Sequence, residues 1–86
     1  MFNIALHKKA MAYNQLDDKT ADRVNDALES ITEHPFEHSN IKKLKGEFEG
    51  SYRYRLGSLR IIYSVNLENN TVFVEAIGSR GDIYKR

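Results

Sequence analysis

The sequence predicts an α+β fold in which two N-terminal helices pack on a twisted, mainly antiparallel sheet. Two observations support this prediction. Apolar residues recur every three or four positions between residues 18 and 33, which is the period of an amphipathic helix. Apolar and polar residues alternate strictly over residues 52–56 and 59–65, which is the period of half-buried strands. The predicted order of elements is β-α-α-β-β-β.

The N-terminal elements are predicted from short patterns. Alternating apolar positions in residues 2–6 indicate a first strand, and apolar residues at helical spacing in residues 8–16 indicate a first helix. Asp17 and Asp18 are candidate N-caps of a second helix, because a carboxylate accepts hydrogen bonds from the free N–H groups of a first helical turn. Pro35 ends this helix, since proline removes a backbone donor. The core side of the second helix is Ala21, Val24, Leu28 and Ile31.

A tight turn at Gly57-Ser58 joins the two alternating segments and fixes their register. With this turn, Arg55 lies directly opposite Arg60, and Arg53 shares their face of the hairpin. Like charges directly opposite each other destabilise a sheet, so the arrangement favours an anionic partner over a merely solvated face. The other face is predicted to enter the core; it carries Tyr52, Tyr54, Leu56, Leu59, Ile61, Tyr63 and Val65.

The remaining segments are a connection and a last strand. Residues 34–50 are expected to form a connecting segment whose lysines are either solvated or extend a basic patch beside the hairpin. Residues 71–78 indicate a third strand of the C-terminal sheet, with Val72, Val74 and Ala76 opposite Leu67, Val65 and Tyr63. Strict alternation would place Arg80 on the core face. A break or bulge near Gly78 is therefore required if Arg80 is to join the other arginines.

Length and composition limit the possible classes of protein. The 86 residues predict a single domain, 1–86, and the absence of cysteine excludes disulfide frameworks and thiol chemistry. Residues 1–40 hold four basic against seven acidic residues, a charge of −3, whereas residues 41–86 hold nine against five, a charge of +4. The basic half is also the strand-rich half. A phosphate-bearing partner is therefore expected on the sheet.

Several kinds of site and location are not supported by the sequence. His34 and His38 are four residues apart, but Pro35 prevents one helix face from presenting both, so no metal site is predicted. No glycine-rich phosphate loop or paired-carboxylate arrangement is present, and no cofactor is expected. The apolar runs are far shorter than the roughly 20 residues of a membrane span, and no secretory segment is visible. The predicted location is cytoplasmic, without membrane association.

Arginine, tyrosine and lysine on a sheet suit one reaction that needs no cofactor, the cleavage of RNA by its own 2′-hydroxyl group. The substrate supplies the nucleophile, so the protein has to orient the RNA backbone and neutralise the charge that develops on the phosphate. The planar guanidinium group of arginine donates two parallel hydrogen bonds to phosphate oxygens. Arginine stays protonated and is not a conventional general base, however.

The motifs LKG, YRYRLGSLRIIYSV and VFVEAIGSRGDIY resemble those of the RelE/ParE toxin superfamily over essentially the entire chain. The resemblance implies the RelE-like fold and, for the RelE branch, a metal-independent endoribonuclease that cleaves mRNA in the ribosomal A site and inhibits translation. By motif position it implies a catalytic role for Arg53, Arg55, Arg60, Arg80 and Tyr84. Lys43 and Lys45 are predicted to bind RNA because their charge extends the basic patch beside the hairpin. Many relatives have histidine where this chain has Ser79.

The resemblance also implies a protein partner and an alternative function. The expected partner is a cognate antitoxin protein of a type II toxin–antitoxin system. The expected cleavage products are a 2′,3′-cyclic phosphate, or its hydrolysis product, and a 5′-hydroxyl. The alternative function is that of a non-catalytic protein, either a ParE-like gyrase inhibitor or a module that only binds its antitoxin.

Overall fold

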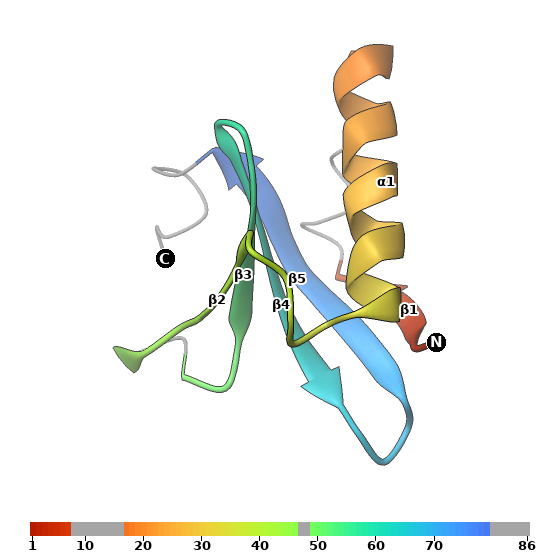
Figure 1. Ribbon diagram of the computed structural model, residues 1–86, viewed down its shortest axis with the longest axis vertical. Coiled ribbons are helices and arrows are strands. Elements are labelled where there is room, and N and C mark those ends of the chain that lie inside the picture. The colour runs from red at the N-terminus through yellow and green to blue at the C-terminus, as the bar shows by residue number, and fades with distance from the viewer. Residues whose placement is uncertain (8–16, 47–48, 80–86) are drawn as a thin grey trace.

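One α-helix packs against one face of a twisted five-stranded sheet (Figure 1). The computed structural model describes residues 1–7, 17–46 and 49–79. The elements in these ranges are β1 (Asn3–Leu6), α1 (Asp18–Glu33), β2 (Ile41–Lys43), β3 (Tyr52–Leu56), β4 (Leu59–Asn66) and β5 (Thr71–Ser79). The strand order is β1-β5-β4-β3-β2. Among the strands of the described ranges, only β1 and β5 pair in parallel, so the prediction of a mainly antiparallel sheet is confirmed.

The order of elements differs from the predicted β-α-α-β-β-β. The described residues contain one helix, α1, and the first predicted helix falls in residues 8–16, outside the described part of the chain. The supposed connecting segment contains the edge strand β2, which pairs with β3. Sequence periodicity missed β2 because it is only three residues long and two of these, Lys42 and Lys43, are charged.

Helix α1 forms where the sequence predicted the second helix. Asp17 is its N-cap and accepts a hydrogen bond from the backbone N–H of Thr20 at 3.4 Å. The helix ends at Glu33, immediately before His34 and Pro35. Its buried side packs on the sheet, and the resulting core consists of Val24, Ala27, Leu28, Ile31, Tyr54, Ile61, Tyr63, Val72 and Val74. No helix in the described ranges is long and apolar enough to cross a bilayer.

Tyr63 ties the connection after α1 to the centre of the sheet. Its ring is fully buried and stacks on Tyr52, and its hydroxyl donates a 2.6 Å hydrogen bond to the Pro35 carbonyl. Burial, together with the neighbouring Tyr52 and Tyr54, raises the pKa of Tyr63 far above its ordinary value. The hydroxyl therefore stays protonated and keeps its role as a donor.

The hairpin register is the one predicted. Leu56 pairs with Leu59, Arg55 with Arg60 and Arg53 with Ile62. Gly57 adopts a φ of +61°, which supports the tight turn, because glycine has no Cβ to oppose a positive φ. The residues of the predicted core face all lie against or within the core.

The predicted register between β4 and β5 is wrong by two residues. Val65 pairs with Val72 and Tyr63 with Val74, because a four-residue turn, residues 67–70, replaces the shorter one expected. Asn70 adopts a φ of +52°, and the side chain of Asn66 accepts a hydrogen bond from the Asn69 backbone, which stabilises this longer turn. Leu67 is consequently exposed rather than paired.

A β-bulge in β5 reverses its side-chain alternation. Tyr63 pairs with Val74 but Ile62 pairs with Ala76, so Glu75 is the additional residue. Beyond the bulge, Ala76 and Gly78 lie on the face of the sheet opposite α1, whereas Ile77 packs against the core. The expectation that Ala76 faces the core is therefore wrong.

Candidate active site

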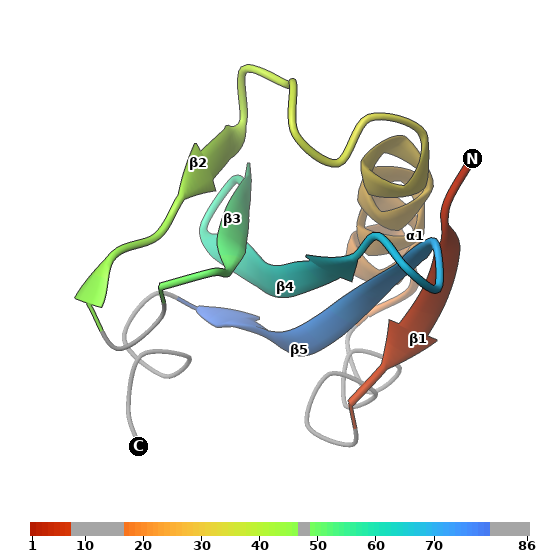
Figure 2. The same ribbon diagram turned by 90° about the horizontal axis from the view of Figure 1, so that it is seen from below.

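The face of the sheet that α1 does not cover, called the outer face here, collects the hairpin arginines. Figure 2 shows β3, β4 and β5 side by side with α1 on one side of the sheet. Arg55 pairs with Arg60, and Arg60 in turn pairs with Gly78. In the neighbouring row, Arg53 pairs with Ile62, which is buried although it is not part of the helix-side core. Three predicted site residues are thus brought together on one face of the sheet.

Arg60 is the most buried of these arginines, with 9% of its surface exposed. Its Nη1 donates to the carbonyl oxygens of Gly57 and Leu59, both at 3.0 Å. These bonds hold the guanidinium group against the hairpin turn despite the opposing charge of Arg55. Alternation alone could not predict them, because they depend on the side-chain conformation of Arg60.

Arg53 has a buried donor that lacks an acceptor among the described residues. Its side chain is half-buried, and among the described residues its Nε finds no hydrogen-bond partner. A buried N–H group without an acceptor costs roughly 1–3 kcal/mol, and such groups in proteins call for a specific explanation. An anion bound on the outer face would supply the acceptor. The unpartnered nitrogen therefore marks a position for an anionic group beside Arg55 and Arg60.

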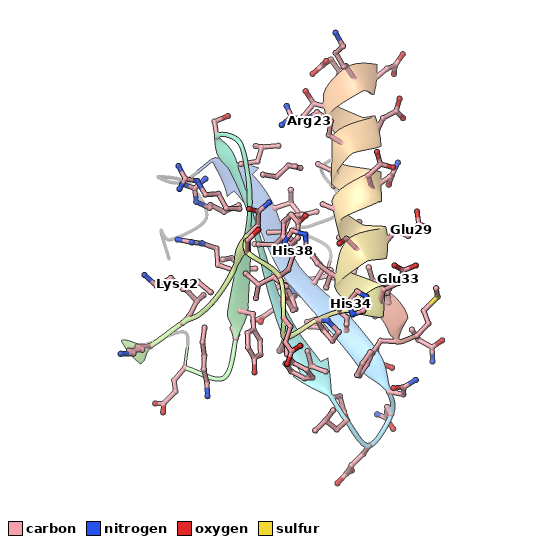
Figure 3. The ribbon with its side chains drawn as sticks, in the orientation of Figure 1. Arg23, Glu29, Glu33, His34, His38 and Lys42 are labelled. Atoms are coloured by element: carbon pink, nitrogen blue, oxygen red, sulfur yellow. The ribbon has the colours of Figure 1, made fainter. Side chains whose placement is uncertain are left out.

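The lysines of the connecting segment are divided between the two faces. Lys42 pairs with Arg53 and lies on the outer face, pointing away from α1 (Figure 3). Lys43 pairs with Tyr52, whose ring packs against the core, so Lys43 projects from the opposite face. Lys45 lies beyond the end of β2 and is exposed. The structure therefore groups Lys42, which sequence analysis did not select, with the arginines, and does not group Lys43 with them.

The last two predicted catalytic residues, Arg80 and Tyr84, lie outside the described residues. From the sequence, Arg80 joins the other arginines only if the strand breaks or bulges at Gly78. Gly78 instead pairs regularly with Arg60, and the alternation of β5 changes three residues earlier, at Glu75.

A carboxylate also lies on the outer face. Glu75 is the only acidic residue in the five strands, and its Oε2 accepts a 2.8 Å hydrogen bond from Ser51 Oγ. The bond spans β4, because Ser51 directly precedes β3 and Glu75 belongs to β5. Sequence analysis missed this residue. A charged side chain within the otherwise apolar segment TVFVEAIG was the available signal.

The hollow that the described residues line does not lie on the outer face. A hollow of about 220 Å³ lies on the other side of the sheet, where Arg23 points from α1 toward the hairpin (Figure 3); Asp26, Ala27, Tyr54 and Leu56 also line it. It is separated from the outer-face arginines by the sheet. Within the described ranges, no three histidine or carboxylate side chains are grouped to hold a metal ion. The chemistry that the described outer face offers is that of its guanidinium groups, which can donate paired hydrogen bonds to phosphate oxygens.

Comparisons with known proteins agree with this architecture. RelE1 of Methanocaldococcus jannaschii is 29% identical over 87 residues, covering 98% of this chain and 96% of that protein. The RelE–RelB complex of Pyrococcus horikoshii has a chain that is 26% identical, with a TM-score of 0.78 and coverage of 94% and 97% of the two chains. Isolated RelE of E. coli is 24% identical, with a TM-score of 0.78 and coverage of 98% and 92%.

The fold is thus RelE-like, with α1 on a mixed five-stranded sheet. The family model for the ParE toxin of the type II toxin–antitoxin system parDE matches residues 6–84, nearly the whole chain. Together with the likeness to RelE proteins, this match shows that the chain belongs to the RelE/ParE superfamily and is a toxin of the type II toxin–antitoxin class.

Proposed function

We propose that this toxin is a ribosome-dependent mRNA endoribonuclease whose active site is the outer face of the sheet. The observation that carries the proposal is the buried Nε of Arg53, which has no partner among the described residues and lies beside the Arg55–Arg60 pair. Three guanidinium groups on one face of the sheet suit a phosphate backbone, because each can donate paired hydrogen bonds to phosphate oxygens. A function in protein binding alone would not require a buried Arg53 donor that lacks an acceptor among the described residues.

The reaction is attack by the 2′-hydroxyl of the RNA on the adjacent phosphate. Arg53, Arg55 and Arg60 neutralise the charge that grows on the phosphate oxygens, and Arg80 is proposed to join them. Tyr84 is proposed to stack on a base or to assist a proton transfer. The positive charge is most effective when the oxygens are most negative, which is in the transition state. The products are a 2′,3′-cyclic phosphate, or its hydrolysis product, and a 5′-hydroxyl.

The similar proteins support the proposed partners. The Pyrococcus horikoshii relative is a RelE–RelB complex, and an E. coli structure is described as the intact RelBE toxin–antitoxin complex. We infer that a cognate antitoxin likewise binds and neutralises this chain. The substrate is proposed to be mRNA in the ribosomal A site, which places the toxin in the cytoplasm.

Purified intact ribosomes carrying a defined mRNA test the proposal. Added toxin should cut the mRNA within the A-site codon, and the new ends should carry the cyclic phosphate and the 5′-hydroxyl. Cleavage should persist in excess EDTA, provided that polyamines keep the ribosomes intact. Cleavage that requires a divalent ion with intact ribosomes, or products with a 5′-phosphate, would contradict this mechanism.

The alternative of a gyrase inhibitor is favoured by one observation, the match to the ParE family model. Under this alternative, the toxin would stabilise gyrase–DNA breaks and leave ribosome-bound mRNA intact. Both readouts can be measured with the same protein preparation. The outer-face arginines would then serve in binding a macromolecule rather than in catalysis.

The division of the lysines between the two faces gives a prediction with a built-in control. Lys42→Ala should lower the rate of cleavage at limiting toxin by roughly fivefold, which corresponds to about 1 kcal/mol, because Lys42 lies beside Arg53. It should also reduce the dependence of binding on salt, since one phosphate contact is lost. Lys43→Ala removes the same charge one residue away, and it should leave the cleavage rate and the salt dependence of binding unchanged. Equal losses in the two variants would mean that only the total charge matters.

A further inference from the structure

Glu75 lies on the outer face because it follows Val74, whose side chain packs in the core. The bulge at Glu75 brings the next residue, Ala76, to the same face. Among the strand residues of this face, which include the hairpin arginines, Lys42 and the uncharged Ile62, Glu75 is the only carboxylate. A charged residue is poorly suited to a central segment of apolar side chains unless it has a specific role.

Ser51 holds the Glu75 carboxylate in a defined orientation. The Ser51 side chain is 8% exposed, and its hydroxyl donates to Oε2 of Glu75 at 2.8 Å. No described residue donates a hydrogen bond to the second oxygen, Oε1, of Glu75. One oxygen is therefore held by Ser51, and no donor from the described residues occupies the other.

The carboxylate lies close to the arginines but is not paired with them. Ser51 and Arg53 are two residues apart along the chain, which corresponds to roughly 7 Å along a strand. Within the described ranges, neither an ion pair nor a hydrogen bond joins Glu75 to Arg53. An RNA phosphate bound at Arg53 would therefore bring its neighbouring ribose within reach of Glu75.

We propose that Glu75 is the general base of the RNA cleavage reaction, an inference that rests on the function proposed above. Oε1 of Glu75 takes the proton of the 2′-hydroxyl as the 2′-oxygen forms its bond to phosphorus. The bond from phosphorus to the 5′-oxygen breaks, and the leaving oxygen takes a proton from water. The outer-face arginines cannot perform the first step, because their guanidinium groups remain protonated. Ser51 is a positioning residue, which orients the carboxylate.

The first test is single-turnover cleavage of ribosome-bound mRNA by Glu75→Gln. A general base contributes about 10²- to 10⁴-fold, so cleavage should fall by at least 100-fold. Binding should not fall, because the change removes a negative charge from a phosphate site; it is measured with mRNA that carries a 2′-deoxy residue at the cleavage position and cannot be cut. Glu68→Gln, in the exposed turn before β5, is the matched control and should leave cleavage unchanged.

Two further variants separate catalysis from structure. Ser51→Ala keeps the carboxylate of Glu75 but removes the hydrogen bond that orients it. Cleavage should therefore fall by less than in Glu75→Gln. Glu75→Ala should regain activity when formate is added, because a small carboxylate can occupy the vacated space and accept the proton. Arg53→Gln should show no such rescue. Thermal unfolding of each variant establishes that it is folded at the assay temperature.

The outcomes distinguish this inference from the proposed function. A wild-type protein that cuts no mRNA would overturn the proposed function and this inference with it. If the wild type cuts, but folded Glu75→Gln cuts equally fast, Glu75 is not the general base and the arginine site stands. Slow cleavage in Glu75→Gln together with equally weakened binding, and no rescue of Glu75→Ala by formate, would also overturn the inference.

Discussion

Replacement of Arg53 by glutamine should lower single-turnover cleavage of ribosome-bound mRNA by about 10²- to 10³-fold, the usual loss when one preorganised donor is removed from a transition state. The fold should not lose stability. Arg53 Nε is buried without a partner among the described residues, so its removal relieves a desolvation cost. The paired measurements are cleavage kinetics and thermal unfolding. Catalysis should fall while the unfolding temperature stays the same or rises.

The effect of an added anion on thermal unfolding should also show whether Arg53 binds an anion or stabilises the fold. Inorganic phosphate should raise the unfolding temperature of the wild type more than that of Arg53→Gln, because binding to the native state alone stabilises it. High salt should reduce the difference. If Arg53→Gln instead unfolds at a lower temperature, and cleavage falls only in proportion to the folded fraction, Arg53 stabilises the fold and the outer face is not an anion site.

The second large effect is expected for Arg60→Gln, which should lose both activity and stability. Its guanidinium group donates to the Gly57 and Leu59 carbonyls, and hydrogen bonds from charged groups contribute roughly 1.5–3 kcal/mol. Relief of repulsion from Arg55 returns only about 0.2–1 kcal/mol. A net loss of about 1–2 kcal/mol should lower the unfolding temperature by several degrees, since each kcal/mol corresponds to about 4–8 °C in a domain of this size.

Arg55→Gln is the matched control for Arg60→Gln. Arg55 faces the same charge across the strands but is exposed and, in the described part of the chain, its side chain makes no hydrogen bond. Its replacement should leave the unfolding temperature unchanged or slightly raised, while cleavage falls. A rise in stability for both variants would mean that charge repulsion outweighs the turn hydrogen bonds of Arg60.

This expectation for Arg60 differs from what the sequence alone indicates. The sequence predicts only the charges and the register of the hairpin. On that basis, removal of either of the two opposed arginines should relieve charge repulsion and leave the fold no less stable. The register itself was predictable, since Gly57-Ser58 is a two-residue turn and fixes the pairing locally. The side chain of Arg60 folds back onto that turn, and this contact cannot be derived from alternation.

Errors in the predicted fold occurred where a turn conformation or strand pairing, rather than residue periodicity, decides the structure. The four-residue turn before β5 shifted one register by two residues, and the bulge at Glu75 then reversed the face of Ala76. Strand β2 is specified by its pairing with β3 rather than by its own three residues. The same pairing determines that Lys42, and not Lys43, lies beside Arg53. The Ser51–Glu75 bond joins residues 24 positions apart, so neither residue predicts the other.

The central claim is that Arg53 contacts the phosphate that is cut, and sulfur substitution at that phosphate tests it most directly. Wild-type toxin would be assayed on ribosome-bound mRNA in which sulfur replaces one non-bridging oxygen at the cleavage position. The stereoisomer that weakens the arginine contact should slow cleavage by roughly tenfold or more, as expected for the loss of about 1.4 kcal/mol or more from a charge-assisted hydrogen bond. In Arg53→Gln the same substitution should have little further effect, because the contact is already absent. Equal slowing by sulfur in the wild type and in Arg53→Gln would contradict the claim.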